Sequence, residues 1–112
     1  MSRENSLPTS IVGRRMRQRR EELGLSLEKV GVAIGIDESS ARARISRYEL
    51  GVHEPPFATT HLIAKALDVP VTFLYCEDDK VALLLMKLHR LDNRELPVFV
   101  QRCIEMLNHC HI

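Results

Sequence analysis

The chain has 112 residues and one net positive charge, with 16 Lys and Arg against 15 Asp and Glu. This length suits a single compact domain, and 45% of apolar residues is enough for a core, which argues against a disordered chain. The sequence contains no apolar run of membrane-spanning length, no signal-peptide pattern and no regular spacing of its three cysteines. We therefore expect a cytoplasmic protein with reduced thiols.

The first third of the chain predicts two helices. Ser10 can cap a helix over Ile11–Leu23, and Ser26 can cap a second helix over Leu27–Ile34. Gly31 lies inside the second helix, where a glycine lowers helix stability by about 1 kcal/mol relative to alanine. Its presence there suggests a close contact with another helix; the alternative is a weak position that the helix simply tolerates.

The next segment, from about Ser39 to Leu50, predicts a short basic helix. Ala41, Ile45 and Tyr48 share one apolar face of it. The opposite face is small at its centre and cationic at its edges, and consists of Ser39, Ala43, Ser46 and Arg47 with Arg42 and Arg44 on its flanks. Small side chains permit close approach, and arginines beside them can bind guanine edges or phosphates, as a helix in a DNA major groove requires. The alternative is that these arginines only solvate an exposed face.

Four more helices are predicted in the remainder of the chain, after an extended His53–Pro56 connector. Asp79 and Asn93 are the expected caps of the last two. No segment alternates convincingly over the length of a strand, so the fold class is all-α. The predicted helices are Phe57 or Thr59 to Leu67, Val71–Tyr75, Lys80–Leu91 and Arg94–Asn108.

Several motifs follow one another over the first 75 residues. They are Leu25-Ser26-Leu27-Glu28-Lys29-Val30-Gly31, Ile34-Gly35-Ile36, Ile45-Ser46-Arg47-Tyr48-Glu49-Leu50-Gly51 and Ile63-Ala64-Lys65-Ala66-Leu67-Asp68-Val69. With these motifs in this order, the segment from about Ile11 to Tyr75 resembles the Cro/lambda-repressor-type (Xre-like) helix-turn-helix family of bacterial and phage regulators. The resemblance covers more than half of the chain.

The resemblance implies a five-helix domain whose second helix braces the DNA backbone and whose third helix lies in the major groove. It also implies an internal salt bridge between Arg20 and Glu49. The basic run on the first helix is usually a solvated face, but beside a groove-reading helix some of its members can contact phosphates. The DNA-binding residues that we expect are Ser39, Ser40, Arg42, Ala43, Arg44, Ser46, Arg47, Arg14, Arg17, Ser26 and Lys29.

One feature departs from the family pattern. Members usually place about four residues between the Gly-Ile of the turn and the isoleucine of the third helix, whereas this chain has eight, from Asp37 to Arg44. The extra residues either lengthen the turn or add about one turn to the start of the third helix. In the second case Ser39 and Ser40 reach the groove edge, while Asp37 and Glu38 repel phosphates.

The sequence predicts a flexible N-terminal arm over residues 1–9, the helix-turn-helix domain over 10–76, and a two-helix C-terminal extension over 77–112. We expect this extension to be a helical hairpin that serves for dimerisation, although its apolar stripes could instead only cover the domain's own core. The residues expected at the dimer interface are Val81, Leu84, Leu88, Leu91, Phe99, Cys103 and Leu107.

The function expected is that of a sequence-specific regulator, most simply a repressor, which binds a pseudo-palindromic duplex operator as a homodimer. The alternative is a protein-interaction module, such as an antitoxin or adaptor, that uses the C-terminal helices. The sequence predicts no enzyme and no cofactor, because nucleophile–base pairs and phosphate loops are absent. It predicts no metal site either, because Cys103, His109, Cys110 and His111 lack ligand spacing.

Overall fold

The computed structural model describes residues 10–110, and helices are the only regular elements in this range. The all-α prediction is confirmed. The expected N-terminal arm over residues 1–9 lies outside the described residues. In chain order the helices are α1 (Ile11–Leu23), α2 (Leu27–Ala33), α3 (Glu38–Leu50), α4 (Phe57–Leu67), α5 (Val71–Tyr75), α6 (Asp79–His89) and α7 (Glu95–Asn108).

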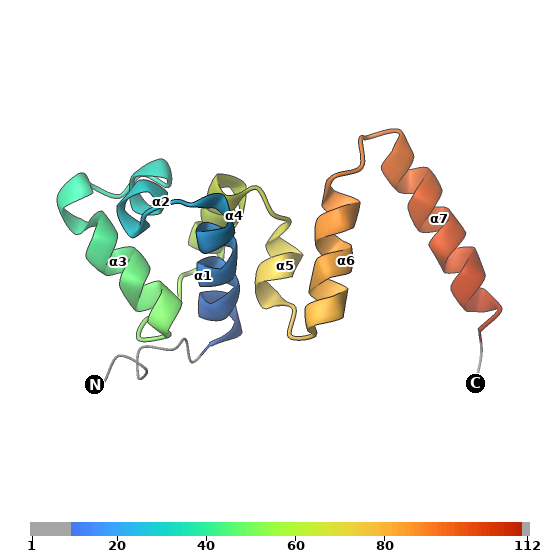
Figure 1. Cartoon of the computed structure of the whole chain (residues 1–112), viewed down its shortest axis with the longest axis horizontal. Helices are drawn as coiled ribbons and strands as arrows, with labels where there is room; N and C mark the ends of the chain where they lie inside the picture. Colours follow the sequence, from blue (N-terminus) through green and yellow to red (C-terminus); the bar gives the residue numbers. More distant parts are fainter. Residues whose placement is uncertain (1–9, 111–112) are drawn as a thin grey trace.

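Helices α1 to α5 form one packed unit with α1 near its middle (Figure 1). The helix α3 packs against α2 and α1, while α4 and α5 pack against α1 from elsewhere along the chain. The core contains Val12 and Met16 of α1, Ile45 of α3, Leu67 of α4 and Phe73 of α5, all of them buried. Because each of these helices supplies part of one core, the position of α3 is fixed by residues distant in sequence.

Two glycines allow α3 to lie close to its neighbours. A Cβ atom at Gly31 of α2 would stand 2.5 Å from the Cβ atom of Ala41. A Cβ atom at Gly13 of α1 would stand 2.2 Å from the carbonyl oxygen of Glu49. Both distances are far below van der Waals contact, so only glycine fits at these two crossings. The close contact predicted for Gly31 is confirmed, whereas the one at Gly13 had not been foreseen.

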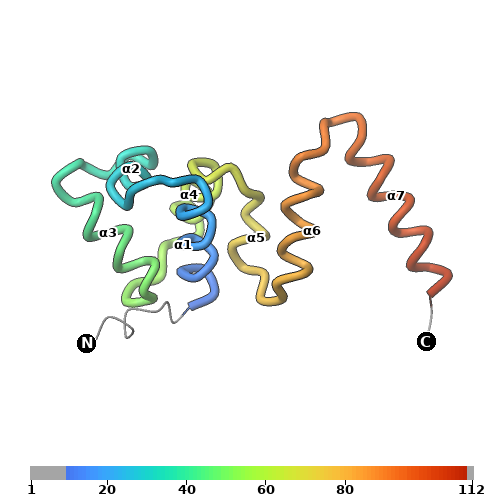
Figure 2. Tube along the Cα trace, viewed as in Figure 1, coloured from blue at the N-terminus to red at the C-terminus, as the bar shows by residue number. Residues whose placement is uncertain are grey.

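The C-terminal helices differ from this unit. Ala82 is the only buried residue of α6, and none of the described residues of α7 is buried. The trace in Figure 2 shows α7 diverging from α6, on the side away from α5. The radius of gyration is 16.3 Å, whereas a compact chain of this length has about 13 Å. Among the described residues, no helix is long and apolar enough to cross a membrane.

Some predicted helix ends were wrong by one or two residues. The helix α6 begins at Asp79 because Asp78, rather than Asp79, accepts hydrogen bonds from the first free backbone N–H groups. It ends at His89, where the chain turns toward α7. Asn93 was expected to cap α7. Instead the Asp92 carboxylate, one residue earlier, accepts hydrogen bonds from the backbone N–H groups of Arg94 and Glu95.

Candidate nucleic-acid interface

The helix α3 is longer at its N-terminus than the family pattern. It begins at Glu38, and the Asp37 carboxylate caps it by accepting a hydrogen bond of 3.1 Å from the backbone N–H of Ser39. It ends at Leu50, because the next residue, Gly51, has a left-handed conformation (φ 79°) that stops the helix. The extra residues therefore lengthen the helix rather than the turn, which decides between the two alternatives left open by the sequence.

The arginines on the outer face of α3 have no partner among residues 10–110. Arg42, Arg44 and Arg47 are exposed, and none of them forms an ion pair or side-chain hydrogen bond with another residue between 10 and 110. The small residues between them are also accessible: Ser39, Ser40 and Ala43 are exposed and Ser46 is half-buried. The buried face holds Ala41, Ile45 and Tyr48, as predicted. We define this outer face, Ser39 to Arg47, as the α3 face.

The Asp37 carboxylate carries a negative charge at the start of α3. The Ser39 hydroxyl donates a hydrogen bond to the Asp37 carboxylate, and this bond, followed by the one from the Ser39 backbone N–H, lowers the pKa of Asp37. Asp37 is therefore ionised at neutral pH and sits favourably at the positive end of the helix dipole. The Ser39 hydroxyl has committed its proton, so it can act toward a DNA ligand only as an acceptor.

The arginines of α1 are engaged inside the protein. Arg20 forms a two-point contact with the buried Glu49 carboxylate, at 2.6 Å from Nε and 3.1 Å from Nη2. This hydrogen-bonded contact raises the pKa of Arg20 above its usual value. Arg17 adds a longer contact of 3.4 Å from its Nε to the same carboxylate. The internal salt bridge that the family resemblance implied is thus present, and it ties α1 to the end of α3.

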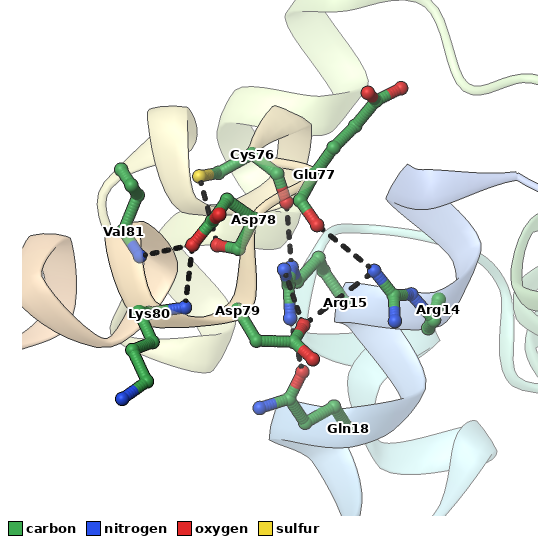
Figure 3. A network of polar contacts seen from close by, with 9 residues as sticks. All are labelled: Arg14, Arg15, Gln18, Cys76, Glu77, Asp78, Asp79, Lys80 and Val81. Atoms are coloured by element: carbon green, nitrogen blue, oxygen red, sulfur yellow. Dashed lines mark hydrogen bonds and ion pairs between the residues drawn. The ribbon is translucent and has the colours of Figure 1, made fainter.

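Two other arginines of α1 reach the junction between α5 and α6 (Figure 3). Arg15 is 2% exposed, donates a hydrogen bond of 2.9 Å to the carbonyl of Cys76 and stands 3.0 Å from Asp79, the first residue of α6. Its guanidinium also lies 5.5 Å from the centre of the Phe73 ring. Arg14 lies more loosely nearby, 3.7 Å from Asp79. These contacts anchor α6 to the helix-turn-helix unit.

Arg19, the remaining arginine of the five in α1, is also buried. Its Nε donates a hydrogen bond of 2.9 Å to the carbonyl of Leu67 at the end of α4. Apart from Arg20, the arginines of α1 were predicted to be solvated or to contact phosphates, so the burial of Arg15 and Arg19 was not foreseen. A signal for it existed, because Val12, Arg15, Met16 and Arg19 follow the i, i+3, i+4, i+7 spacing of a single helix face.

The start of α2 offers a second group of polar atoms. Ser26 and Lys29 are exposed, and the Ser26 side chain caps the helix by accepting from the Lys29 backbone N–H at 3.0 Å. The Ser26 hydroxyl proton and the Lys29 ammonium group remain available for phosphate oxygens.

The cysteines in the described range, Cys76, Cys103 and Cys110, are free thiols. His111, one of the weak metal-ligand candidates, lies outside the described residues.

The comparisons with known proteins agree with this geometry. A family model described as helix-turn-helix matches residues 16–74. The chain belongs to the helix-turn-helix family. Two uncharacterized HTH-type transcriptional regulators, from Sinorhizobium medicae and Rhizobium meliloti, are each 38% identical to it over 64 residues. That match covers 57% of this chain but 43% of each relative, so the chain spans less than half the length of these regulators.

A solved structure resembles more of the chain. The crystal structure of the transcriptional regulator BswR matches with a TM-score of 0.75 and 36% sequence identity, over 84% of this chain and 92% of that chain. The family model alone ends at residue 74. The likeness to BswR therefore extends beyond the helix-turn-helix region. The resemblance to Cro/lambda-repressor-type regulators, drawn from sequence motifs, is confirmed at the level of the family and its fold.

Proposed function

We propose that this helix-turn-helix protein is a sequence-specific regulator that acts in the cytoplasm by placing α3 in the major groove of duplex DNA. The observation that carries the proposal is the contrast between its two arginine groups. All five arginines of α1 contact acceptors within the chain, whereas the three on the α3 face contact none among the described residues. An exposed helix face with small residues between unpaired guanidinium groups fits a groove lined with base acceptors and phosphates.

The contacts divide into two kinds in this proposal. Arg42, Arg44 and Arg47 read base edges or adjacent phosphates, with Ser39, Ser40, Ala43 and Ser46 lying close to the groove. Ser26 and Lys29 at the start of α2 bind the phosphate backbone, as does Arg17, which is 28% exposed beside Glu49. Arg14 would have to leave Asp79 and the carbonyl of Glu77 to reach a phosphate, so it is the weakest member of the set.

The regulator acts as a homodimer in this proposal. Two copies would bind a pseudo-palindromic operator with half-site centres about 34–36 Å apart, or a multiple of that spacing. The interface would use the C-terminal helices through Val81, Leu84, Leu88, Leu91, Phe99, Cys103 and Leu107. These side chains are exposed or half-buried in the chain on its own, which supports this assignment. Repression is the simplest outcome, because an occupied promoter excludes polymerase.

Selection of bound duplexes from a random DNA pool tests this function. We expect the purified protein to enrich a two-fold symmetric motif whose half-site spacing is set by the dimer. The matched control is the triple variant Arg42→Ala, Arg44→Ala and Arg47→Ala, which alters only exposed positions and should fold normally but enrich nothing. If the folded wild-type protein also enriched no motif, the proposal would be wrong.

A second function rests on a separate observation, the uncovered apolar surface of α6 and α7. In this alternative the chain is an antitoxin or adaptor whose C-terminal helices bind a different protein. A salt titration discriminates between the two. Operator binding weakens steeply with salt, by about −0.9 in log–log slope for each phosphate neutralised, whereas association through apolar side chains is far less sensitive.

A further inference from the structure

One hydroxyl group on the α3 face already uses its proton within the protein. The Ser39 hydroxyl donates a hydrogen bond to Oδ2 of Asp37, and the Ser39 backbone N–H donates to the same oxygen at 3.1 Å. Asp37 and Ser39 therefore form a closed pair. Because a hydroxyl group has one proton and two lone pairs, the Ser39 hydroxyl in this pair offers only lone pairs to a ligand.

The negative charge of Asp37 holds the Ser39 hydroxyl in this orientation. The bond from the hydroxyl, followed by the bond from the backbone N–H, lowers the pKa of Asp37, so the carboxylate is ionised at neutral pH. A hydrogen bond to an ionised acceptor is about twice as strong as one between neutral groups. If the hydroxyl turned to donate to a base, it would exchange this bond for a weaker one. Both residues are exposed, so a ligand can reach them without a change of fold.

Ser39 lies on the central line of the α3 face. At 100° per residue, Ser39 and Ser46 are about 20° apart around the helix axis, and Ala43 is about 40° from Ser39. The buried Ala41 is about 200° from Ser39, so Ser39 is directed away from the core. The middle of an exposed helix face comes nearest to the base edges when that helix lies in a major groove. Ser39 is thus placed to contact a base edge.

The other polar side chains of the α3 face offer donors or have no fixed role. Arg42, Arg44 and Arg47 each carry five donors and no acceptor, which suits guanine edges and phosphate oxygens. Ser40 is exposed, and its hydroxyl forms no hydrogen bond with another residue between 10 and 110, so it can donate or accept. Among the described residues of this face, Ser39 is therefore the side chain that is fixed as an acceptor.

The floor of the major groove offers donors that match such an acceptor. Adenine N6 and cytosine N4 each present an amino group there, whereas guanine O6 and thymine O4 are acceptors. A hydroxyl group fixed as an acceptor is attracted to the amino group and repelled by the keto oxygen. The charge of Asp37 acts in the same direction, because a carboxylate attracts the partial positive charge of an amino group and repels a keto oxygen.

From these observations we infer that Ser39, held by Asp37, selects an amino base, adenine or cytosine, at one position of each half-site. This inference rests on the proposed function, because it requires α3 in the major groove, and it adds the class of base that is read. With the base facing Ser39 written first, A·T and C·G are accepted at this position, and T·A and G·C are disfavoured. An arginine that binds guanine leaves a different signature, because it accepts one base pair of the four.

Binding to a set of altered operators tests the inference. The selected half-site is changed to each of the four bases at one position at a time, and fluorescence titration gives the affinity of the wild-type protein for each duplex. We expect one position at which A and C bind about 2- to 12-fold more tightly than G and T, the range that one hydrogen bond supplies. Ser39→Ala should bring the four bases at this position to within about twofold of one another. Preferences at the other positions should be unchanged.

Two further variants make the test specific to the pair. Ser40→Ala is the matched control, because it removes an exposed hydroxyl group that is not bound to Asp37, and the preference for A and C should remain. Asp37→Asn keeps a good helix cap but replaces the charge by an amide group that can donate. We expect this variant to accept G and T at the same position. Ser39→Ala keeps the backbone N–H that Asp37 caps, so α3 should begin at the same residue, and circular dichroism checks this.

The possible results separate this inference from the proposed function. A two-fold motif without any position that prefers A and C would overturn the inference and leave the proposed function intact. The inference is also wrong if the preference survives Ser39→Ala, or if Ser40→Ala removes it equally. Enrichment of no motif by the folded wild-type protein would overturn both.

Discussion

The arginines of α1 and those of α3 have the same chemistry but opposite surroundings. In α1, Arg15 and Arg19 are buried and Arg20 is bound to Glu49, so the guanidinium groups join α1 to α3, α4 and α6. In α3, Arg42 and Arg47 extend into solvent with no partner among the described residues. The comparison shows that a basic cluster in a sequence need not be a ligand-binding surface. An arginine has five donors in a planar fork, so it can connect protein segments as well as it can bind phosphate.

The largest expected effect concerns the arginines of α1. Replacement of Glu49 by alanine should lower the free energy of unfolding by about 3–5 kcal/mol, because it leaves Arg20 and Arg17 beside a buried site without their carboxylate. Urea denaturation measures the change. Glu49→Gln, which keeps the volume and removes the charge, should be less destabilising. A loss below about 1 kcal/mol for the alanine variant would mean that these arginines do not support the fold.

The next effect concerns the α3 face. Replacement of Arg47 by alanine should weaken binding to the selected operator by about 1–3 kcal/mol if the side chain reads a base. Thermal unfolding should be unchanged, because the side chain is exposed and contacts no other described residue. A titration against the operator and against unrelated duplexes gives the comparison. Equal losses on both would make Arg47 a phosphate contact, and no loss on either would remove it from the interface.

The salt dependence of operator binding should separate the two groups further. If Arg44 neutralises one phosphate, Arg44→Ala should reduce the magnitude of the log–log salt slope by about 0.9. Arg14→Ala should change the slope less, because its guanidinium already lies between Asp79 and the carbonyl of Glu77. Fluorescence titrations at several salt concentrations measure both slopes. A larger change for Arg14 than for Arg44 would reverse the assignment of the two helices.

The smallest effect concerns the stability of the Arg14→Ala variant. Arg14→Ala should lower the free energy of unfolding by less than about 1 kcal/mol, because its pair with Asp79 is 3.7 Å long and exposed to solvent on both sides. Arg15→Ala, one residue later, should cost more, because the side chain is buried and also donates to the Cys76 carbonyl. Urea denaturation of the two variants side by side measures the difference. Equal losses would show that burial does not distinguish the two arginines.

Local chemistry in the sequence determined much of this protein. The caps at Ser10, Ser26 and Gly51 and the apolar face of Ala41, Ile45 and Tyr48 placed the first helices within a residue or two, because capping and helical periodicity act between neighbours in the chain. The order of the sequence motifs along the chain indicated the family. Gly31 could be interpreted correctly because an interior helix glycine indicates close packing wherever its partner lies.

Tertiary structure decided the rest. Burial of Arg15 depends on Phe73, Cys76 and Asp79, which are more than 50 residues away, so no local pattern states that its charge is compensated. The lengthening of α3 was one of two alternatives until its cap at Asp37 was seen. The start of α7 depends on hydrogen bonds between Asp92 and Glu95 that lie outside any apolar periodicity. Periodicity tells which face of a helix is apolar, but only the folded chain shows whether that face already has a neighbour.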